Sequence, residues 1–180
     1  MNALSTKRSL INTIVAILLL IFAAFVSDSK FNPTISSDVL GTDSTVYTVT
    51  SIVDGDTIKV ADSQGQYTVR LIGIDTPETK DPRKEVECFG EEATLYLTKL
   101  IKDNSITLKS DSTQDEIDRY GRLLRYAFLQ DGTNINKTMI QDGYAYEYTY
   151  SKPYYYQKEF IDAQHFAQNG RLGLWSGVCD

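Results

Sequence analysis

The 180-residue sequence contains a single histidine, His165, and this scarcity excludes several classes of enzyme. Nucleases that depend on histidine, Ser-His-Asp hydrolases and zinc enzymes with histidine ligands all need imidazoles beside their other catalytic groups. His165 lies in the middle of a helical pattern, and we interpret it as a surface or packing residue. Any catalysis must therefore rely on carboxylates, arginines or a metal held by oxygen ligands.

Positive charge is also scarce, because 18 lysines and arginines face 24 aspartates and glutamates, for a net charge of −6. An acidic balance argues against tight, salt-driven binding to a polyanion and weighs against a module that only binds nucleic acid. Hydrophobic residues make up 42% of the chain and charged residues 23%, as in ordinary globular proteins. No internal repeat is present, and the length suits one domain with additional segments.

The N-terminal segment lacks charge over residues 10–26, and Lys7 and Arg8 precede this apolar run. Residues 1–26 are predicted to be either a signal peptide or an N-terminal membrane anchor, since no clear Ala-x-Ala cleavage site follows. No cysteine follows closely enough to suggest a lipid anchor. The basic flank predicts an extracytoplasmic domain, secreted or anchored to the outer face of the cell membrane. Residues 27–44, rich in Ser and Asp, are predicted to be a flexible linker.

Cys88 and Cys179 are the only cysteines. They are either two unrelated buried thiols or a disulfide, and export favours the disulfide. Such a bond would connect the start of the first helix of the domain to the C-terminal end.

The order of elements from residue 45 to 180 predicts an α+β fold. Alternating or β-branched runs predict strands over residues 46–53, 57–62, 67–74, 105–110 and 122–132. Helical spacing predicts three helices: residues 87–102, residues 134–143, and a last helix that begins near Pro153 and ends at Gly170. Five strands with a helix between the third and fourth are typical of a five-stranded Greek-key OB-fold barrel.

Two carboxylates are predicted to meet at one end of this barrel. Asp56 follows an Asp-Gly turn at the start of the second strand, and Asp75 ends the third strand. If these strands are antiparallel neighbours, either one carboxylate takes a proton or a cation lies between them. Oxygen ligands suit Ca²⁺ or Mg²⁺ rather than zinc. Asp54 and Gly55 are interpreted as turn formers only.

Two arginines and a glutamate complete the candidate chemistry. Arg70, Arg122 and Glu78 around such a cation form a plausible arrangement for attack on a phosphodiester. The alternative for Arg119 and Arg122 is a solvated cluster with Asp118 or Glu116.

Five motifs in order are similar to those of the staphylococcal nuclease (thermonuclease) family: "VDGDT", "RLIGIDTPE", "CFGEEA", "DRYGR" and "GLW". The resemblance spans about residues 46–176. It implies a Ca²⁺-dependent phosphodiesterase that cleaves DNA and RNA and leaves 3′-phosphates. It further implies that Asp56, Asp75 and the carbonyl of Thr76 bind calcium. The roles implied for the remaining residues are phosphate binding by Arg70, water activation or positioning by Glu78, and transition-state stabilisation by Arg122.

The resemblance also implies a nucleotide pocket lined by tyrosines, for which Tyr120, Tyr148 and Tyr150 are the candidates. Stacking on tyrosine tolerates any base and would suit a non-specific nuclease. The charged loop at residues 80–85 is either a solvated loop or one that steers nucleic acid. A monomer without an obligate protein partner is expected, attached to the membrane if the N-terminal segment is not cleaved. The competing function is a catalytically inactive OB-fold module that binds nucleic acid or a protein.

Overall fold

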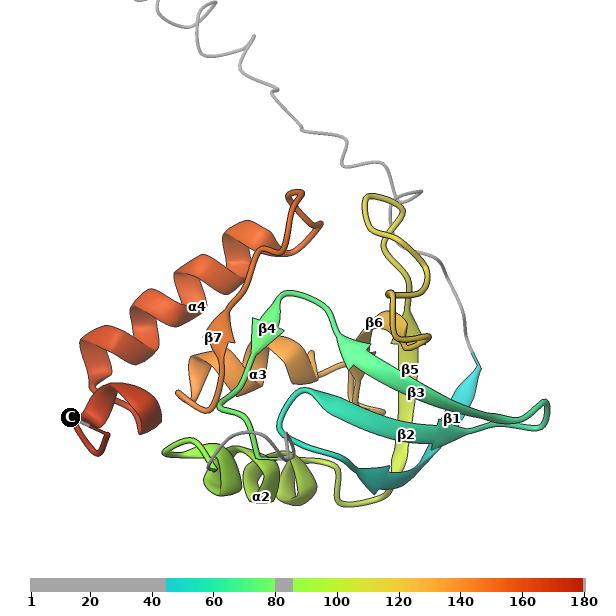
Figure 1. The fold of residues 1–180 in the computed structure, drawn as a ribbon, viewed down its shortest axis with the longest axis horizontal. Helices are drawn as coiled ribbons and strands as arrows, with labels where there is room; N and C mark the ends of the chain where they lie inside the picture. The colour runs from blue at the N-terminus through green and yellow to red at the C-terminus, as the bar shows by residue number, and fades with distance from the viewer. Residues whose placement is uncertain (1–44, 80–85, 180) are drawn as a thin grey trace, which may run out of the picture. The chain divides into compact units, whose positions relative to one another are not determined.

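The computed structural model describes residues 45–79 and 86–179 (Figure 1). The predicted signal or anchor at 1–26, the predicted linker at 27–44 and the charged loop at 80–85 lie outside the described residues. Within the described part of the chain, no helix combines the length and the apolar character that crossing a membrane requires.

Five strands form a closed barrel in the order β1-β2-β3-β6-β5, with β5 pairing back onto β1. Their bounds are Val46–Ile52 for β1, Thr57–Ala61 for β2, Gln66–Leu71 for β3, Ser105–Lys109 for β5 and Leu123–Phe128 for β6. Only the β3–β6 pair is parallel. Helix α2 (Gly90–Leu100) lies between the third and fourth barrel strands in sequence, so the predicted five-stranded OB-fold is confirmed.

The barrel interior follows from the alternation of side chains along each strand. Ile58 and Val60 of β2, and Ile106 of β5, are fully buried. Burying such side chains contributes roughly 1.5–3 kcal/mol each, before the entropy of ordering the chain is counted. The strands that carry the site therefore have a fixed register.

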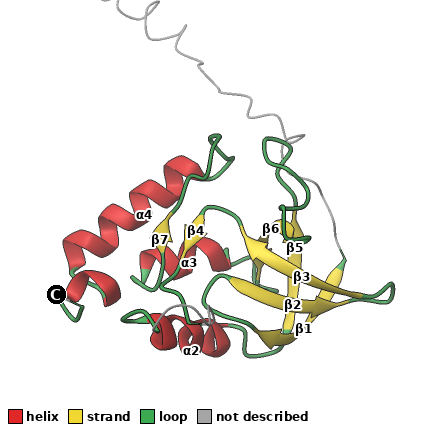
Figure 2. Ribbon diagram, viewed as in Figure 1, coloured by secondary structure: helices red, strands yellow, loops and turns green. Residues whose placement is uncertain are grey.

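Two further helices cover one side of the barrel. Helix α3 (Ile135–Gln141) packs against β6 and against α4 (Gln157–Gly170), and a short 3₁₀ helix, η1 (Gly173–Ser176), follows (Figure 2). Asn136 is completely buried in α3. Its amide oxygen accepts a hydrogen bond from Ala127 N, and its amide nitrogen donates to Ile72 O over 2.8 Å. One side chain thus fixes the chain segment that leads from β3 toward the site.

Helix α4 begins later than the sequence predicts, at Gln157 instead of near Pro153. The intervening tyrosines are held by other partners. Tyr154 is buried, and its hydroxyl donates to Glu147 Oε1 and to Gly73 O. The backbone N–H of Tyr155 donates to the buried carboxylate of Asp111. These bonds hold the chain in a non-helical path until Tyr156.

The third predicted strand is also interrupted, so Asp75 does not lie at its end. Strand β3 stops at Leu71, and Gly73 turns the chain with φ +78°. A Cβ at Gly73 would lie 2.6 Å from the ring of Tyr154, so only glycine fits there. Asp75 instead belongs to β4 (Ile74–Asp75), which pairs with β7 (Tyr146–Glu147). This second, two-stranded sheet brings the tyrosine segment beside Asp75.

Cys88 and Cys179 form a disulfide with their Cα atoms 5.8 Å apart. The bond joins the segment before α2 to the C-terminal end, across a sequence separation of 91. Closing a loop of this length contributes about 4–5 kcal/mol in the chain-entropy model.

Candidate active site

Asp56, Arg70 and Asp75 form one ion-paired cluster at the end of the barrel. The antiparallel register pairs Thr57 with Arg70, which places the side chain of Arg70 next to Asp56. One guanidinium nitrogen of Arg70 forms an ion pair with Asp56 Oδ2, and the other donates to Asp75 Oδ1 over 2.8 Å. Asp56 is buried and also accepts a hydrogen bond from the backbone N–H of Thr76 over 3.2 Å. The predicted meeting of the two carboxylates therefore occurs, with Arg70 as their shared partner.

Arg122 joins this cluster through the parallel pairing of β3 with β6, which aligns Val69 with Leu123. Its Nε donates to Asp118 Oδ2 over 2.7 Å, and its Nη1 donates to Thr57 Oγ1 over 3.4 Å. The Thr57 hydroxyl in turn donates to Asp56 Oδ1 over 2.9 Å. Thr57 thus connects the second arginine to the first carboxylate.

Asp118 orients Arg122 through a tight turn. Its Oδ1 accepts hydrogen bonds from the backbone N–H groups of Tyr120 and Arg122, and Gly121 adopts φ +81° within the turn. Although partial burial acts to raise the pKa of Asp118, the hydrogen bonds from Arg122 and Tyr120 lower it on balance. The partner of Arg122 is therefore ionised at neutral pH. Arg119 differs from the expected cluster, because it donates to Tyr120 Oη over 2.7 Å and lies over that ring.

Asp54 and Gly55 do more than form a turn. The backbone of Gly55 lies outside the left-handed region, and a Cβ there would lie 2.8 Å from Thr76 Cγ2 and 3.0 Å from the side chain of Ala93. Glycine is required for close packing beneath Thr76 rather than for a positive φ. Burial and the charge of Asp56 raise the pKa of Asp54 to about 7. Asp54 is thus a third carboxylate at the same place.

The carboxyl groups of the cluster are the side chains that could hold a cation. Asp56 and Asp75 pair with Arg70, and Asp54 accepts a hydrogen bond from the backbone N–H of Asp56. Burial raises the pKa of Asp75 despite its ion pair with Arg70, and Asp56 adds to the rise. Within residues 45–79 and 86–179, no group of three or more His, Cys, Asp or Glu side chains has a metal-binding arrangement. The available ligands are oxygens only, and Ca²⁺ or Mg²⁺ also accept backbone carbonyls and water, so a hard divalent cation fits this ligand set.

Glu78 lies on the segment after β4 and is held by different contacts. Its backbone N–H donates to Glu87 Oε2 over 3.0 Å, and its carbonyl accepts from Glu87 N over 2.9 Å. The Glu78 carboxylate accepts from Thr79 N over 2.8 Å. Residues 75–78, "DTPE", are not at the start of a helix, because the next helix, α2, begins only at Gly90. Glu78 is therefore held through its backbone by Glu87, shortly before α2.

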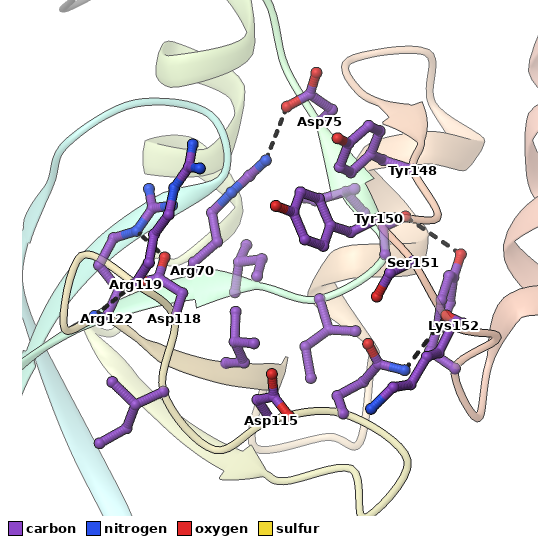
Figure 3. Close-up of a pocket in the computed structure, with 18 of the residues that line it drawn as sticks. Arg70, Asp75, Asp115, Asp118, Arg119, Arg122, Tyr148, Tyr150, Ser151 and Lys152 are labelled. Atoms are coloured by element: carbon purple, nitrogen blue, oxygen red, sulfur yellow. Dashed lines mark hydrogen bonds and ion pairs between the residues drawn. The ribbon is translucent and has the colours of Figure 1, made fainter.

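A cavity of about 510 Å³ opens beside the arginines (Figure 3). Arg70, Asp75 and Arg122 line it, as do the three predicted tyrosines, Tyr120, Tyr148 and Tyr150. The three tyrosines are 68%, 43% and 73% exposed, so a large part of each side chain is accessible to solvent. In Figure 3 Arg70, Arg119 and Arg122 lie at the left, and Tyr148 and Tyr150 lie to their right. The cavity therefore offers a ligand both guanidinium groups and aromatic rings.

Several lining residues were not among those predicted from the sequence. Asp115, Ser151 and Lys152 line the cavity, and Gln114 donates from its amide to the carbonyl of Pro153 over 3.0 Å. Thr57 was also missed, although it is the last residue of "VDGDT". Its position in the motif was the signal that could have identified it. For the others the sequence carries no local signal, because the fold alone brings residues 114–118 beside 148–152.

Comparison with known proteins decides the family. The model of the staphylococcal nuclease homologues matches residues 68–177. The chain belongs to the staphylococcal nuclease family. It is 32% identical to a thermonuclease of Staphylococcus hyicus over 91% of this chain and 94% of that one. A thermonuclease of Staphylococcus intermedius is 35% identical over 89% of this chain and 92% of its own length.

Similarity extends to longer proteins of Bacillus subtilis. The SPbeta prophage-derived endonuclease YokF is 37% identical over 72% of this chain, which spans only 43% of YokF. Endonuclease YncB is 35% identical over the same share of this chain, which spans 61% of YncB. The predicted family is thus confirmed, and the predicted class, a nuclease hydrolase, is confirmed at the level of that family.

Proposed function

We propose that this chain is a Ca²⁺-dependent nuclease that hydrolyses DNA and RNA with little sequence specificity and leaves 3′-phosphate ends. The observation that carries the proposal is the linked cluster of Asp56, Arg70, Asp75 and Arg122 at the edge of a tyrosine-lined cavity. Carboxylates suited to a cation and guanidinium groups suited to phosphate stand together where a nucleotide fits.

Asp56, Asp75 and the carbonyl of Thr76 are the proposed calcium ligands. When bound, calcium supplies positive charge that polarises the phosphodiester and offsets charge on its oxygens. The raised pKa values of Asp54 and Asp75 support this assignment, because a divalent cation beside Arg70 would make these carboxyl groups easier to ionise.

Arg70 binds the scissile phosphate through the two guanidinium nitrogens that pair with Asp56 and Asp75 in this structure. A phosphate offers the same paired oxygens to a guanidinium fork. Arg122 stabilises the charge that develops on the phosphoryl oxygens and on the leaving oxygen. Its bonds to Asp118 and Thr57 fix its orientation beforehand, and a preorganised donor is worth more in the transition state than a free one.

Glu78 accepts the proton of the attacking water or holds that water in line. The match of "RLIGIDTPE" to the family pattern supports this assignment. Tyr120, Tyr148 and Tyr150 stack on the bases that flank the cleaved bond. Stacking discriminates weakly between bases, and this supports low sequence specificity.

Cleavage in calcium, with chelator as the comparison, tests the proposal. The purified full chain, kept in mild detergent, is incubated with plasmid DNA, single-stranded DNA and RNA. We expect cleavage of all three in Ca²⁺ and none in chelator. We also expect products that a polymerase extends only after phosphatase treatment, because a 3′-phosphate blocks extension.

The second candidate is an inactive OB-fold module that binds nucleic acid or a protein. It predicts binding without cleavage under every metal condition in the same assay. The carboxyl groups of the site favour the enzyme, since Asp75 at the cavity and Asp56 behind Arg70 disfavour a polyanion unless a cation joins them. Cleavage that is unaffected by chelator would instead contradict the calcium assignment.

Export to the outside of the cell membrane is part of the proposal. The apolar run at residues 10–26 with its basic flank supports it, as does a domain with two cysteines joined in a disulfide. Mass spectrometry of the mature N-terminus distinguishes a cleaved signal peptide from a retained anchor.

A further inference from the structure

Of the four consecutive residues Glu87 to Gly90, the first and the last contact the segment that carries Glu78, and the two between them contact other parts of the chain. Glu87 makes two hydrogen bonds with Glu78, one from its backbone N–H and one to its carboxylate. Gly90 lies directly against the same segment, because a Cβ there would lie 2.5 Å from Thr79 Cγ2 and 2.9 Å from Pro77 O. We call the four residues Glu87–Gly90 the platform, because their contacts hold the segment that carries Glu78.

The two middle residues of the platform are fixed from outside. Cys88 is bonded to Cys179, and Phe89 stacks on Tyr144 with ring centroids 5.4 Å apart. Tyr144 stacks in turn on Tyr96 of α2 at 3.9 Å with the rings nearly parallel. Phe89 adopts φ +71°, a conformation that a non-glycine residue keeps only when its surroundings hold it.

Position and exposure single out the disulfide among these contacts. Cys88 and Cys179 are exposed, so the bond does not fill the barrel core. It lies one residue from Glu87, whose hydrogen bonds reach Glu78 directly. A crosslink needed only for stability could join any two surface segments. This one joins the C-terminal end to the residue next to the support of the proposed base.

We propose that the Cys88–Cys179 disulfide positions Glu78 by locking the platform Glu87–Gly90, so that it sets turnover as well as stability. The inference rests on the proposed role of Glu78. The two cysteines are positioning residues that act through Glu87 and Gly90. Without the bond the platform keeps its hydrogen bonds, but the platform itself is less firmly fixed, and Glu78 moves with it.

The test compares the parent chain with the double variant Cys88→Ser/Cys179→Ser, both full length, below both melting temperatures. We expect kcat for DNA cleavage to fall about tenfold while KM stays within twofold, because a small displacement of a base affects the transition state more than ground-state binding. Leu108→Ala, in the barrel and away from Glu78, serves as the control for a loss of stability alone and should keep kcat within twofold. Treating the parent with a phosphine reductant should reproduce the effect, and the double variant should not respond.

A second variant perturbs the platform without touching the disulfide. Gly90→Ala adds a Cβ against Pro77 and Thr79 and should lower kcat severalfold. Gly65→Ala is the matched control, because a Cβ there meets only the Tyr67 hydroxyl at 3.9 Å. Unchanged kcat in both Gly90→Ala and the double cysteine variant would overturn the inference.

Hydrogen exchange gives a readout that does not depend on activity. In the double cysteine variant, the peptide that carries Glu78 should exchange at least tenfold faster, while peptides from β2 and β5 keep their rates. If the parent cleaves DNA and this peptide exchanges no faster in the variant, the positioning role fails and the nuclease stands. If the parent does not cleave DNA, the proposed function fails, and the exchange rates still decide whether the disulfide orders the segment.

Discussion

The two halves of the candidate site are held in place by different means. Asp56, Arg70 and Arg122, the barrel-held half, are placed by the register of β2, β3 and β6 and by a hydrogen-bonded turn. Glu78, the tethered half, is placed by contacts to residues before α2 and, through them, by a disulfide to the far end of the chain. The barrel-held half shares the stability of the core, whereas the tethered half can move without unfolding the barrel. Substitutions in the two halves should therefore have different signatures.

The largest effect is expected from Glu78→Gln, which removes the carboxylate of the tethered half and almost no volume. Loss of a general base lowers kcat by about 10²–10⁴-fold. The melting temperature and calcium affinity should stay close to those of the parent, since the backbone contacts to Glu87 remain. Steady-state kinetics with plasmid DNA measure the change, and Glu91→Gln on the exposed start of α2 is the control. Parent-like turnover in Glu78→Gln would remove this residue from the chemistry.

Arg122→Ala tests the barrel-held half and should come next. Removing one preorganised donor to a developing charge costs about 10²–10³-fold in kcat, and KM should change much less. Arg122→Lys keeps the charge but not the paired geometry to Asp118 and Thr57, so it should recover only a small part of the activity. Full recovery by lysine would mean that charge alone matters, and that the network through Thr57 does not orient this residue.

Prediction from the sequence succeeded for the barrel-held half because short-range sequence patterns determine where its residues lie. Alternating strands, the Asp-Gly turn and the arginine after "DRYG" are short-range patterns, and strand pairing turns them into contacts. It failed where a distant group decides the local conformation. The break at Gly73 exists because the ring of Tyr154 lies against its Cα, and Gly55 is needed because Thr76 packs on it. The Cys88–Cys179 disulfide was favoured from the sequence, but the support of Glu78 by the platform could not be predicted, since it depends on how Gly90 packs on Thr79 and on what Phe89 stacks.

Asn136→Ala should lower the stability of the fold and also weaken the anchoring of the segment that leads from β3 to the site. The substitution leaves Ala127 N–H and Ile72 O without their buried partner and creates a small void. We expect the free energy of unfolding to fall by about 2–4 kcal/mol, as measured by urea titration. Asn134→Ala removes the N-cap of the same helix, whose side chain accepts from Lys137 N, and should cost about 1 kcal/mol. Equal losses for the two variants would mean that Asn136 does not anchor the segment leading to β4.

Asp54 makes the stability of the barrel-held half depend on pH. Its pKa is about 7 in the folded chain and 3.8 as a free side chain, so between these values the folded state binds more protons than the unfolded state. The free energy of unfolding of the metal-free protein should therefore fall as pH rises from about 4 to 7. Asp54→Asn should flatten this dependence and raise stability at pH 8 by on the order of 2 kcal/mol, since no buried charge remains to be desolvated. Urea titrations in chelator at pH 5 and pH 8 measure it, and an unchanged slope in the variant would assign the dependence to other carboxylates.

The smallest effect is expected from Tyr150→Ala, at the open side of the cavity. Tyr150 is 73% exposed, with its ring centroid 6.3 Å from that of Tyr148, so its removal leaves the barrel intact. Stacking of one base on an aromatic ring contributes about 1–3 kcal/mol, and an exposed ring should lie at the low end, which corresponds to a KM for single-stranded DNA raised about fivefold. Turnover at saturation should not change, because neither half of the site loses a reacting group. Phe166→Ala, which removes an exposed aromatic ring of α4 outside the cavity lining, is the control. A lower kcat in Tyr150→Ala at unchanged KM would show instead that this ring orients the reacting groups, and would connect the tyrosine side of the cavity to the chemistry.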